Sequence, residues 1–405
     1  MTTMTDPDKI LDRLAHWQRG LREQFPIIAN NPRLAYLDSA STTQKPAAVL
    51  DAVTDYLTTG NANAGRGSYP WATATTARIE AARDRVRKAL DDTGTESSVE
   101  FVGGTSDGLR AVARDWLADL LADGDEIIVP FGDHEANLRP WLDLRQDLAH
   151  KGIRITVLPM PVDAASGDYD HRALPSIVTA RTRFVAVTHV HHVFGTDLNV
   201  HRVREAVGPN VPICLDAAQS VGHLPVSVTD LDVDFVVFSG HKMLALPGVG
   251  AVWARNRRGP RFALRGWAGT PNVVGIVSMT AAFDWLDGAG LADIGAWTTA
   301  LGVRLTDGLA QLAGVRVLGC QNSLTADSPV QRRQGIVTFR HTRVRSDDLG
   351  FVLADQGIMV RADSHCQAGR KSDDHAVRVS AHVYNTPEEI DRVLDVVRMC
   401  EGAMS

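Results

Sequence analysis

The sequence predicts an α/β protein in which a mostly parallel sheet lies between helices, followed by a smaller α+β domain. The chain has 405 residues, which is too long for one ordinary hydrophobic core, so we expect two domains. Short apolar runs alternate with helical stretches through most of the chain, as in parallel sheets covered by helices. Beyond about Met279, long helical segments give way to short strands, which indicates a second architecture.

The individual elements follow from hydrophobic periodicity. The N-terminal segment carries Ile10, Leu11, Leu14 and Trp17 at helical spacing, which predicts a short amphipathic helix. Periodicity predicts further helices at 47–58 and 77–89, and apolar runs predict strands at 98–102, 126–130, 154–158, 184–188, 211–215 and 235–238. Later strands are expected at 335–339, 358–361 and 376–380. We place the large domain at 25–285 and the small domain at 286–405, with the helix in 1–24 packed on the small domain.

Composition excludes several classes of protein. A net charge of −6 gives no reason to expect nucleic-acid or membrane partners. No apolar run approaches about 18 residues, and the polar first residues do not resemble a secretory signal. The cysteines are widely spaced without a metal-ligand pattern, which favours a reducing cytoplasm and no metal site. They are Cys214, Cys320, Cys366 and Cys400.

Lys242 is the most informative residue, because it ends the segment 239–242, Ser-Gly-His-Lys, which follows the apolar strand predicted at 235–238. An ammonium group at the end of a buried strand loses hydration. A Schiff base with a carbonyl cofactor removes that charge, and pyridoxal phosphate (PLP) is the usual cofactor of this kind. The alternative is a surface lysine that extends its amine into water.

Asp216 ends another apolar strand, at a spacing from Lys242 that fits a strand, a crossover and a second strand. PLP chemistry needs an anion beside the pyridine nitrogen, because a protonated ring accepts electrons from the substrate. Gln219 is then placed to hydrogen-bond the ring hydroxyl. Asp216 as a helix N-cap is the alternative.

The segment 103–106 leaves a predicted strand and enters a helix. Backbone N–H groups at a helix start, together with the hydroxyls of Thr105 and Ser106, suit a phosphate dianion. A simple hydroxyl N-cap would also explain these residues.

Together these motifs resemble the class V aminotransferase group of fold-type I PLP enzymes. The resemblance is strongest to the SufS-type (group II) cysteine desulfurases and selenocysteine lyases. It implies a large domain with a mostly parallel seven-stranded sheet and a smaller C-terminal domain. It extends in consistent order over the segments 34–46, 61–67, 101–108, 134–141, 216–219, 239–242, 269–272 and 378–386.

The resemblance implies that Lys242 binds pyridoxal 5'-phosphate and removes the Cα proton. It implies that His134 stacks on the pyridine ring and assists proton transfer. Thr270 matches a residue that reaches the phosphate across a dimer interface, which implies a homodimer. The phosphate ligands that the resemblance implies in one chain are Thr105, Ser106, Ser239 and His241.

The resemblance also assigns substrate residues. Arg378 matches the residue that binds the substrate α-carboxylate, which a planar guanidinium holds with two parallel hydrogen bonds. Arg361 matches a residue to which we give a loop-anchoring role. Cys366 matches the loop cysteine that attacks the substrate sulfur as a thiolate. Positive charge for that thiolate is expected from His365, Arg370 and Lys371.

Several residues depart from the family pattern on the substrate side. Cys366 is followed by 367–369, Gln-Ala-Gly, rather than by Ala and Pro, which predicts a less rigid loop. His192 stands where asparagine is usual. Gly65 stands where histidine commonly precedes Arg66, and Trp71 adds an aromatic group near the same wall.

From these departures we predict a PLP enzyme that cleaves the C–S bond of cysteine or of an S-substituted cysteine, as in specialised natural-product pathways. An ordinary cysteine desulfurase that forms a persulfide on Cys366 is the first alternative, and it leaves open a protein that accepts the sulfur. Decarboxylation-linked oxidative deamination of an S-conjugated cysteine and amino-acid epimerisation are the others. A PLP-binding protein without activity is disfavoured, because it would have no use for an intact set of cofactor ligands.

Overall fold

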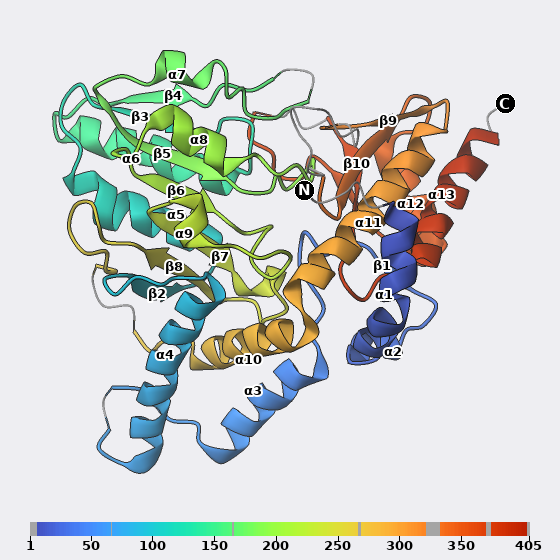
Figure 1. Cartoon of the computed structure of the whole chain (residues 1–405), viewed down its shortest axis with the longest axis horizontal. Helices are drawn as coiled ribbons and strands as arrows, with labels where there is room; N and C mark the ends of the chain where they lie inside the picture. Colours follow the sequence, from blue (N-terminus) through green and yellow to red (C-terminus); the bar gives the residue numbers. More distant parts are fainter. Residues whose placement is uncertain are drawn as a thin grey trace.

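The chain forms a large and a small lobe that lie side by side (Figure 1). The computed structural model describes residues 6–65, 67–163, 166–265, 269–320, 333–369 and 374–402. The large lobe surrounds one extended sheet, whereas the N-terminal and C-terminal helices both lie in the small lobe. None of the helices in these ranges is long and apolar enough to cross a membrane.

Seven strands of the described chain form the large sheet, in the order β2-β8-β7-β6-β5-β3-β4. All neighbours pair in parallel except β8, which is antiparallel to both β2 and β7. The prediction of a mostly parallel seven-stranded sheet is therefore confirmed. The strands are β2 (Ser98–Val102), β3 (Glu126–Val129), β4 (Thr156–Pro159), β5 (Thr182–Thr188), β6 (Ile213–Asp216), β7 (Phe235–Ser239) and β8 (Gly250–Ala254).

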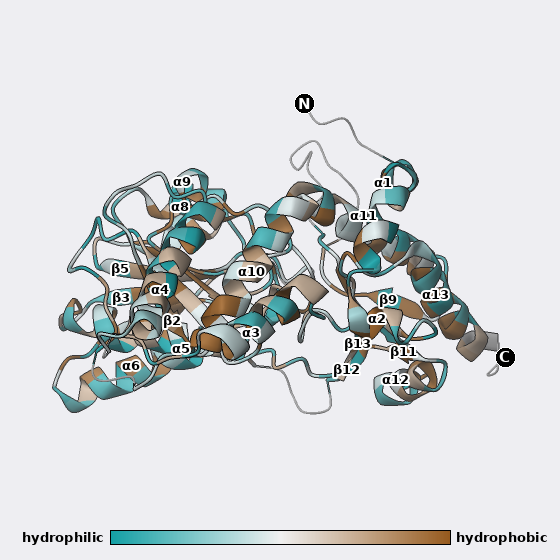
Figure 2. Cartoon of the chain, turned by 90° about the horizontal axis from the view of Figure 1, so that it is seen from below, coloured by the Kyte–Doolittle hydropathy of each residue, from teal (hydrophilic) through white to brown (hydrophobic). Residues whose placement is uncertain are grey.

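Both faces of this sheet are buried. Along β7, Phe235 and Val237 enter one hydrophobic core, and Val236 and Phe238 enter the core on the opposite face. Figure 2 shows hydrophobic strands between helices whose outer surfaces are largely hydrophilic. The helices of this lobe are α3 (Ala47–Thr59), α4 (Pro70–Ala89), α5 (Thr105–Ala111), α6 (Arg139–His150), α7 (Leu174–Ile177), α8 (Val200–Val207), α9 (Val228–Leu231) and α10 (Val273–Ala289).

The strand register brings three carboxyl ends to one edge of the sheet. Thr188 at the end of β5 pairs with Asp216 at the end of β6. Asp216 pairs in turn with Val237, so β7 ends only two residues later, at Ser239. In open parallel sheets, ligands bind at this edge.

The small lobe contains an antiparallel sheet in the order β12-β13-β10-β9. Leu11 and Leu14 of α1 share a core with α11, so the N-terminal helix packs on this lobe. The boundary at residue 285 stays a prediction. The elements are α1 (Pro7–Arg22), α2 (Pro26–Ala29), β1 (Ala35–Tyr36), α11 (Leu291–Ala310), β9 (Val315–Val317), β10 (Ile336–His341), α12 (Ser346–Asp355), β11 (Ile358–Met359), β12 (Arg361–Asp363), β13 (Ala376–Ser380) and α13 (Pro387–Gly402).

An early segment of the chain, 35–38, pairs with strands of the small lobe. β1 pairs in parallel with β11, and an isolated bridge joins Asp38 to Ser380 at the end of β13. The segment that follows includes Ala40 and Ser41. It lies between the two lobes and reaches the edge of the large sheet where β5, β6 and β7 end.

One predicted helix begins elsewhere in the structure, and one strand was not predicted. α4 begins at Pro70 rather than at 77, because proline suits the first position of a helix and its first turn lacks an apolar stripe. β8 was not predicted, because the glycines and proline at 246–250 indicated only a turn.

Candidate active site

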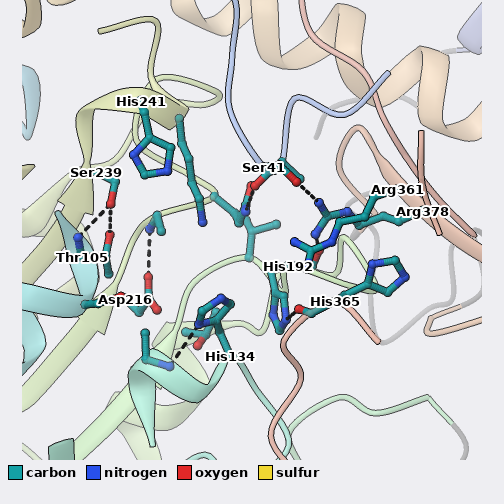
Figure 3. A pocket seen from close by; sticks show the side chains of 18 residues that line it. Ser41, Thr105, His134, His192, Asp216, Ser239, His241, Arg361, His365 and Arg378 are labelled. Carbon is teal, nitrogen blue, oxygen red and sulfur yellow. Dashed lines mark hydrogen bonds between the residues drawn. The ribbon is translucent and has the colours of Figure 1, made fainter. Parts of the chain in front are cut away.

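A cavity of about 230 Å³ lies at the carboxyl ends of β5, β6 and β7, where the small lobe covers the large sheet. It is far larger than the roughly 10–15 Å³ that one water molecule needs. Its wall combines the residues that the sequence predicted with several that it did not (Figure 3). The residues that line it are Ala40, Ser41, Thr105, Ser106, His134, Ala136, Thr188, Val190, His192, Asp216, Ala218, Gln219, Ser239, His241, Lys242, Arg361, His365 and Arg378.

Lys242 ends the short 3-10 turn Gly240–Lys242, which directly follows β7. Burial lowers the pKa of its amine to about 8, and the nearby carboxylate of Asp216 opposes this shift. A substantial fraction of this amine is therefore uncharged at neutral pH, which is the state that condenses with an aldehyde. Lys242 is partly exposed and lines the cavity.

Asp216 is buried at the end of β6. Burial raises the pKa of its carboxyl to about 6, although the backbone N–H of Ala218 donates to its Oδ1 at 3.0 Å. A carboxylate in this setting gains from a cationic partner. A protonated pyridine nitrogen would be such a partner, so Asp216 fits the role that the sequence predicted.

Hydroxyl groups gather at another part of the wall. The Thr105 and Ser239 hydroxyls lie 2.7 Å apart, and the backbone N–H of Thr105 donates to Ser239 Oγ at 2.8 Å. Ser106 and His241 line the same cavity. Gly250 on β8 lets the backbone before Thr105 come close, because a Cβ at residue 250 would lie 2.7 Å from the Cα of Gly104. These donors fit a phosphate group.

His134 begins a 3-10 turn, and its Nδ1 accepts a hydrogen bond from the backbone N–H of Ala136 at 3.0 Å. Burial, with a contribution from the charge of Lys242, lowers the pKa of His134 to about 4. His134 is therefore neutral at pH 7, with its proton on Nε2. A neutral ring in the wall fits a stacking partner of an aromatic cofactor.

Gln219 is held by a partner that the sequence did not suggest. Its Nε2 donates to the carbonyl of Ala40 at 2.8 Å, which fixes the amide in the wall. Gln219 can still offer hydrogen bonds to a ring hydroxyl, but its orientation depends on the segment that comes from the small lobe.

Arg378 lies on β13 and is buried. Its Nη2 donates to Asp38 at 3.0 Å and to Ser41 at 2.8 Å, and its Nη1 donates to the backbone carbonyl of His192 at 3.1 Å. Both protons of Nη2 are therefore engaged. Two parallel hydrogen bonds to a substrate carboxylate require the Ser41 contact to open or to be shared.

Asp38 and Ser41 were missed as functional residues. They lie in the segment 34–46, which carries the family resemblance but has no charge pattern that points to Arg378. Their contact with Arg378 arises from the bridge between Asp38 and Ser380, which the sequence does not reveal.

Cys366 lies beside the cavity rather than in its wall. Its side chain is exposed, and Arg361 Nη2 lies 3.3 Å from its Sγ. Arg361 itself lines the cavity and binds Asp363, which fits its predicted anchoring role. His365 also lines the cavity, whereas the predicted cations Arg370 and Lys371 lie outside the described residues.

The Cys366 loop (364–369) makes hydrogen bonds with the segment 132–135. The backbone N–H of Glu135 donates to the Cys366 carbonyl at 3.1 Å, and that of Ala368 donates to the Asp133 carbonyl at 2.8 Å. The Gln367 side chain donates to the carbonyl of Gly132 at 2.8 Å. The expectation of a less rigid loop stays a prediction, and it took no account of these hydrogen bonds.

Some predicted residues do not meet in the cavity of this chain. Gly65 and Thr270 are exposed and do not line it, and Trp71 is exposed on α4. Arg66 lies outside the described residues. Within the described ranges, no group of three His, Cys, Asp or Glu side chains could hold a metal ion.

Comparisons with known proteins agree with this geometry. Residues 35–393 match the family model described as aminotransferase class-V. A protein named cysteine desulfurase from Cronobacter sakazakii is 33% identical over 406 residues, covering 92% of this chain and 96% of its own. A probable cysteine desulfurase from Halalkalibacterium halodurans is 32% identical over 401 residues, covering 92% and 95%.

Solved structures give the same result. The cysteine desulfurase CsdA from Escherichia coli superposes with a TM-score of 0.80 at 28% identity, over 95% of this chain and 98% of the other. An apo cysteine desulfurase from Thermococcus onnurineus superposes with a TM-score of 0.82 at 26% identity, over 94% and 97%. The fold is therefore that of the fold-type I enzymes.

Proposed function

Because the chain belongs to the class V aminotransferase family of PLP-dependent enzymes, we propose that it is a cysteine desulfurase that takes the substrate sulfur on Cys366. The observation that carries this proposal is the exposed Cys366 thiol, which lies 3.3 Å from Arg361 at the edge of the cavity. The thiolate is the nucleophilic form of cysteine, and the guanidinium places a positive charge beside the sulfur that would attack. The names of the relatives support this function over the S-substituted cysteine lyase that the sequence first suggested.

The residues of the cavity suit PLP. Thr105, Ser106, Ser239 and His241 would hold its phosphate, Asp216 its ring nitrogen, Gln219 its hydroxyl, His134 its ring face and Lys242 its aldehyde carbon. When bound, PLP supplies an electron acceptor for the bonds at the substrate Cα.

The chain's own residues would then act on cysteine in order. Arg378 orients the substrate carboxylate, and Lys242 accepts the Cα proton at its Nζ. The Cys366 thiolate attacks the substrate Sγ, so an S–S bond forms while the Cβ–Sγ bond breaks. The electron pair released at Cβ takes up a proton, and Lys242 Nζ returns a proton to Cα. The products are alanine and a persulfide on Cys366.

We further propose that the active enzyme is a homodimer in which Thr270 completes the partner's phosphate site. Thr270 is exposed and absent from the cavity wall of its own chain, as such a role requires. Mixing Lys242→Ala and Thr270→Ala subunits at limiting PLP should restore activity that neither variant has. No restoration in a verified mixed dimer would contradict this arrangement.

A C–S lyase acting on S-substituted cysteine is the second candidate. The Cys366 side chain lies outside the cavity wall, and direct elimination of a thiolate does not need it. Of the substrate-side departures, His192 lines the cavity, whereas Gly65 does not.

Replacing Cys366 separates these candidates. For a desulfurase, Cys366→Ala should abolish alanine formation from cysteine but leave elimination of β-chloroalanine intact, because chloride leaves without a sulfur acceptor. Cys400→Ala on α13 is the matched control and should behave like the wild type. Pyruvate and ammonia from S-methylcysteine, unaffected by Cys366→Ala, would replace the proposal with the lyase. Carbon dioxide or a D-amino acid as product would instead indicate oxidative deamination or epimerisation.

A further inference from the structure

His192 joins three parts of the site that come from distant segments of the chain. Its ring edge meets the ring of His134, with centroids 4.9 Å apart and planes at 70°. Its backbone carbonyl accepts the hydrogen bond from Arg378, and its Nε2 lies 3.0 Å from the carbonyl oxygen of His365 (Figure 3). A carbonyl oxygen only accepts, so Nε2 carries the proton and His192 is the donor.

The segment that receives this hydrogen bond has an unfavourable backbone conformation. His365 and Cys366 have φ values of +59° and +56°, a left-handed pair that side chains with a Cβ rarely adopt. Such a conformation persists only where surrounding contacts impose it. The segment 132–135 makes hydrogen bonds to this loop, and Asp363 Oδ1 accepts the backbone N–H of His365 at 2.6 Å. The His192 ring adds a contact from the segment that follows β5.

The face of His192 is also supported. It stacks on the His191 ring at 5.0 Å with an interplanar angle of 21°, and the Nδ1 of His191 accepts the backbone N–H groups of Val193 and Phe194. The ring is buried, so it has little freedom to turn its Nε2 away from His365. Asparagine, which is usual at this position, is too short to place a donor at the same point.

We propose that His192 is a positioning residue that holds the Cys366 loop in its left-handed conformation, and so keeps the thiol beside Arg361 for sulfur transfer. This inference rests on the proposed desulfurase function. It assigns His192 to the loop rather than to the substrate, because the ring's donor is engaged by the His365 carbonyl.

Three substitutions of His192 in the holoenzyme test this role. His192→Phe keeps an aromatic ring but removes the donor, and His192→Asn shortens the side chain so that its amide falls short. His192→Gln loses the ring but offers an amide donor close to the position of Nε2. We expect the Phe and Asn variants to lose about tenfold in kcat for alanine formation from cysteine, the size of one hydrogen bond. The Gln variant should recover most of that loss.

Two further measurements separate positioning from a general structural effect. Elimination of β-chloroalanine should fall by a much smaller factor than alanine formation in the Phe and Asn variants, because it does not use Cys366. Hydrogen exchange of the peptide that spans 363–369 should be about tenfold faster in the Phe and Asn variants than in the wild type and the Gln variant.

The outcomes are distinct. Unchanged sulfur transfer and unchanged exchange in the Phe and Asn variants would overturn the inference. Equal loss of β-chloroalanine elimination would also overturn it, because His192 would then serve the chemistry at Cα. If the Cys366→Ala variant still transfers sulfur, the proposed function fails. Hydrogen exchange of 363–369 in the His192 variants still tests whether His192 holds the loop.

Discussion

The amine of Lys242 should lose its proton near pH 8, and this prediction tests the feature on which the chemistry depends. With a pKa of about 8, about one fifth of this amine is uncharged at pH 7.4. An ordinary lysine with a pKa of about 10.4 would be about 0.1% uncharged at that pH. At pH 7.4 the uncharged fraction of the Lys242 amine should therefore be about 200-fold larger than that of an ordinary lysine.

Competitive acetylation of the cofactor-free protein from pH 6 to 11, read by mass spectrometry, gives the midpoint for each lysine. Asp216→Asn should move the Lys242 midpoint further down, because the carboxylate of Asp216 favours the charged amine. Lys45 is the internal control, since burial lowers its pKa to about 8 without a contribution from Asp216. A Lys242 midpoint above about 9.5, or an upward movement in Asp216→Asn, would refute the reasoning.

Three further perturbations address the substrate clamp, the buried carboxyl and the core. Arg378→Lys should raise KM for cysteine by about 10- to 100-fold in steady-state assays with less effect on kcat, because an ammonium cannot replace the planar fork; a lower KM would contradict this. Burial raises the pKa of Asp216 from its usual 3.8 to about 6, so its stabilising contribution is complete below pH 3.8 and lost as pH rises through 6. When pH falls from 7 to 5, the free energy of unfolding of the cofactor-free wild type in urea should therefore rise by about 1.3 kcal/mol relative to that of Asp216→Asn. No such rise would count against the assignment. Asp234 is buried against Arg204, Arg257 and Arg258. Asp234→Ala should therefore lower the free energy of unfolding in urea by about 2 kcal/mol, which is less than for a fully buried pair because the arginines are partly exposed. An unchanged unfolding midpoint would show that solvent screens the cluster.

The cofactor side of the cavity could be predicted from the sequence because solvation acts locally there. An amine or a carboxyl at the end of an apolar strand is visible in the order of residues, as with Lys242 and Asp216. The parallel register then brings the strand ends together without further information.

The substrate side could not be predicted in the same way, because its contacts join segments that are distant in the chain. Asp38, near the start of the chain, meets Arg378 because it forms a β-bridge with Ser380, near the end of the chain. His192 meets His365 through the docking of one loop on another. The hydrogen bonds of the Cys366 loop could not be predicted from Gly369, because a local sequence does not reveal the contacts that a loop makes with its surroundings.

The left-handed backbone at His365 and Cys366 limits which residues can replace these two. Valine, isoleucine and threonine are strongly disfavoured at positive φ, whereas glycine, asparagine and aspartate tolerate it. A mutant library at position 365 should therefore yield active clones mainly with those three residues and histidine.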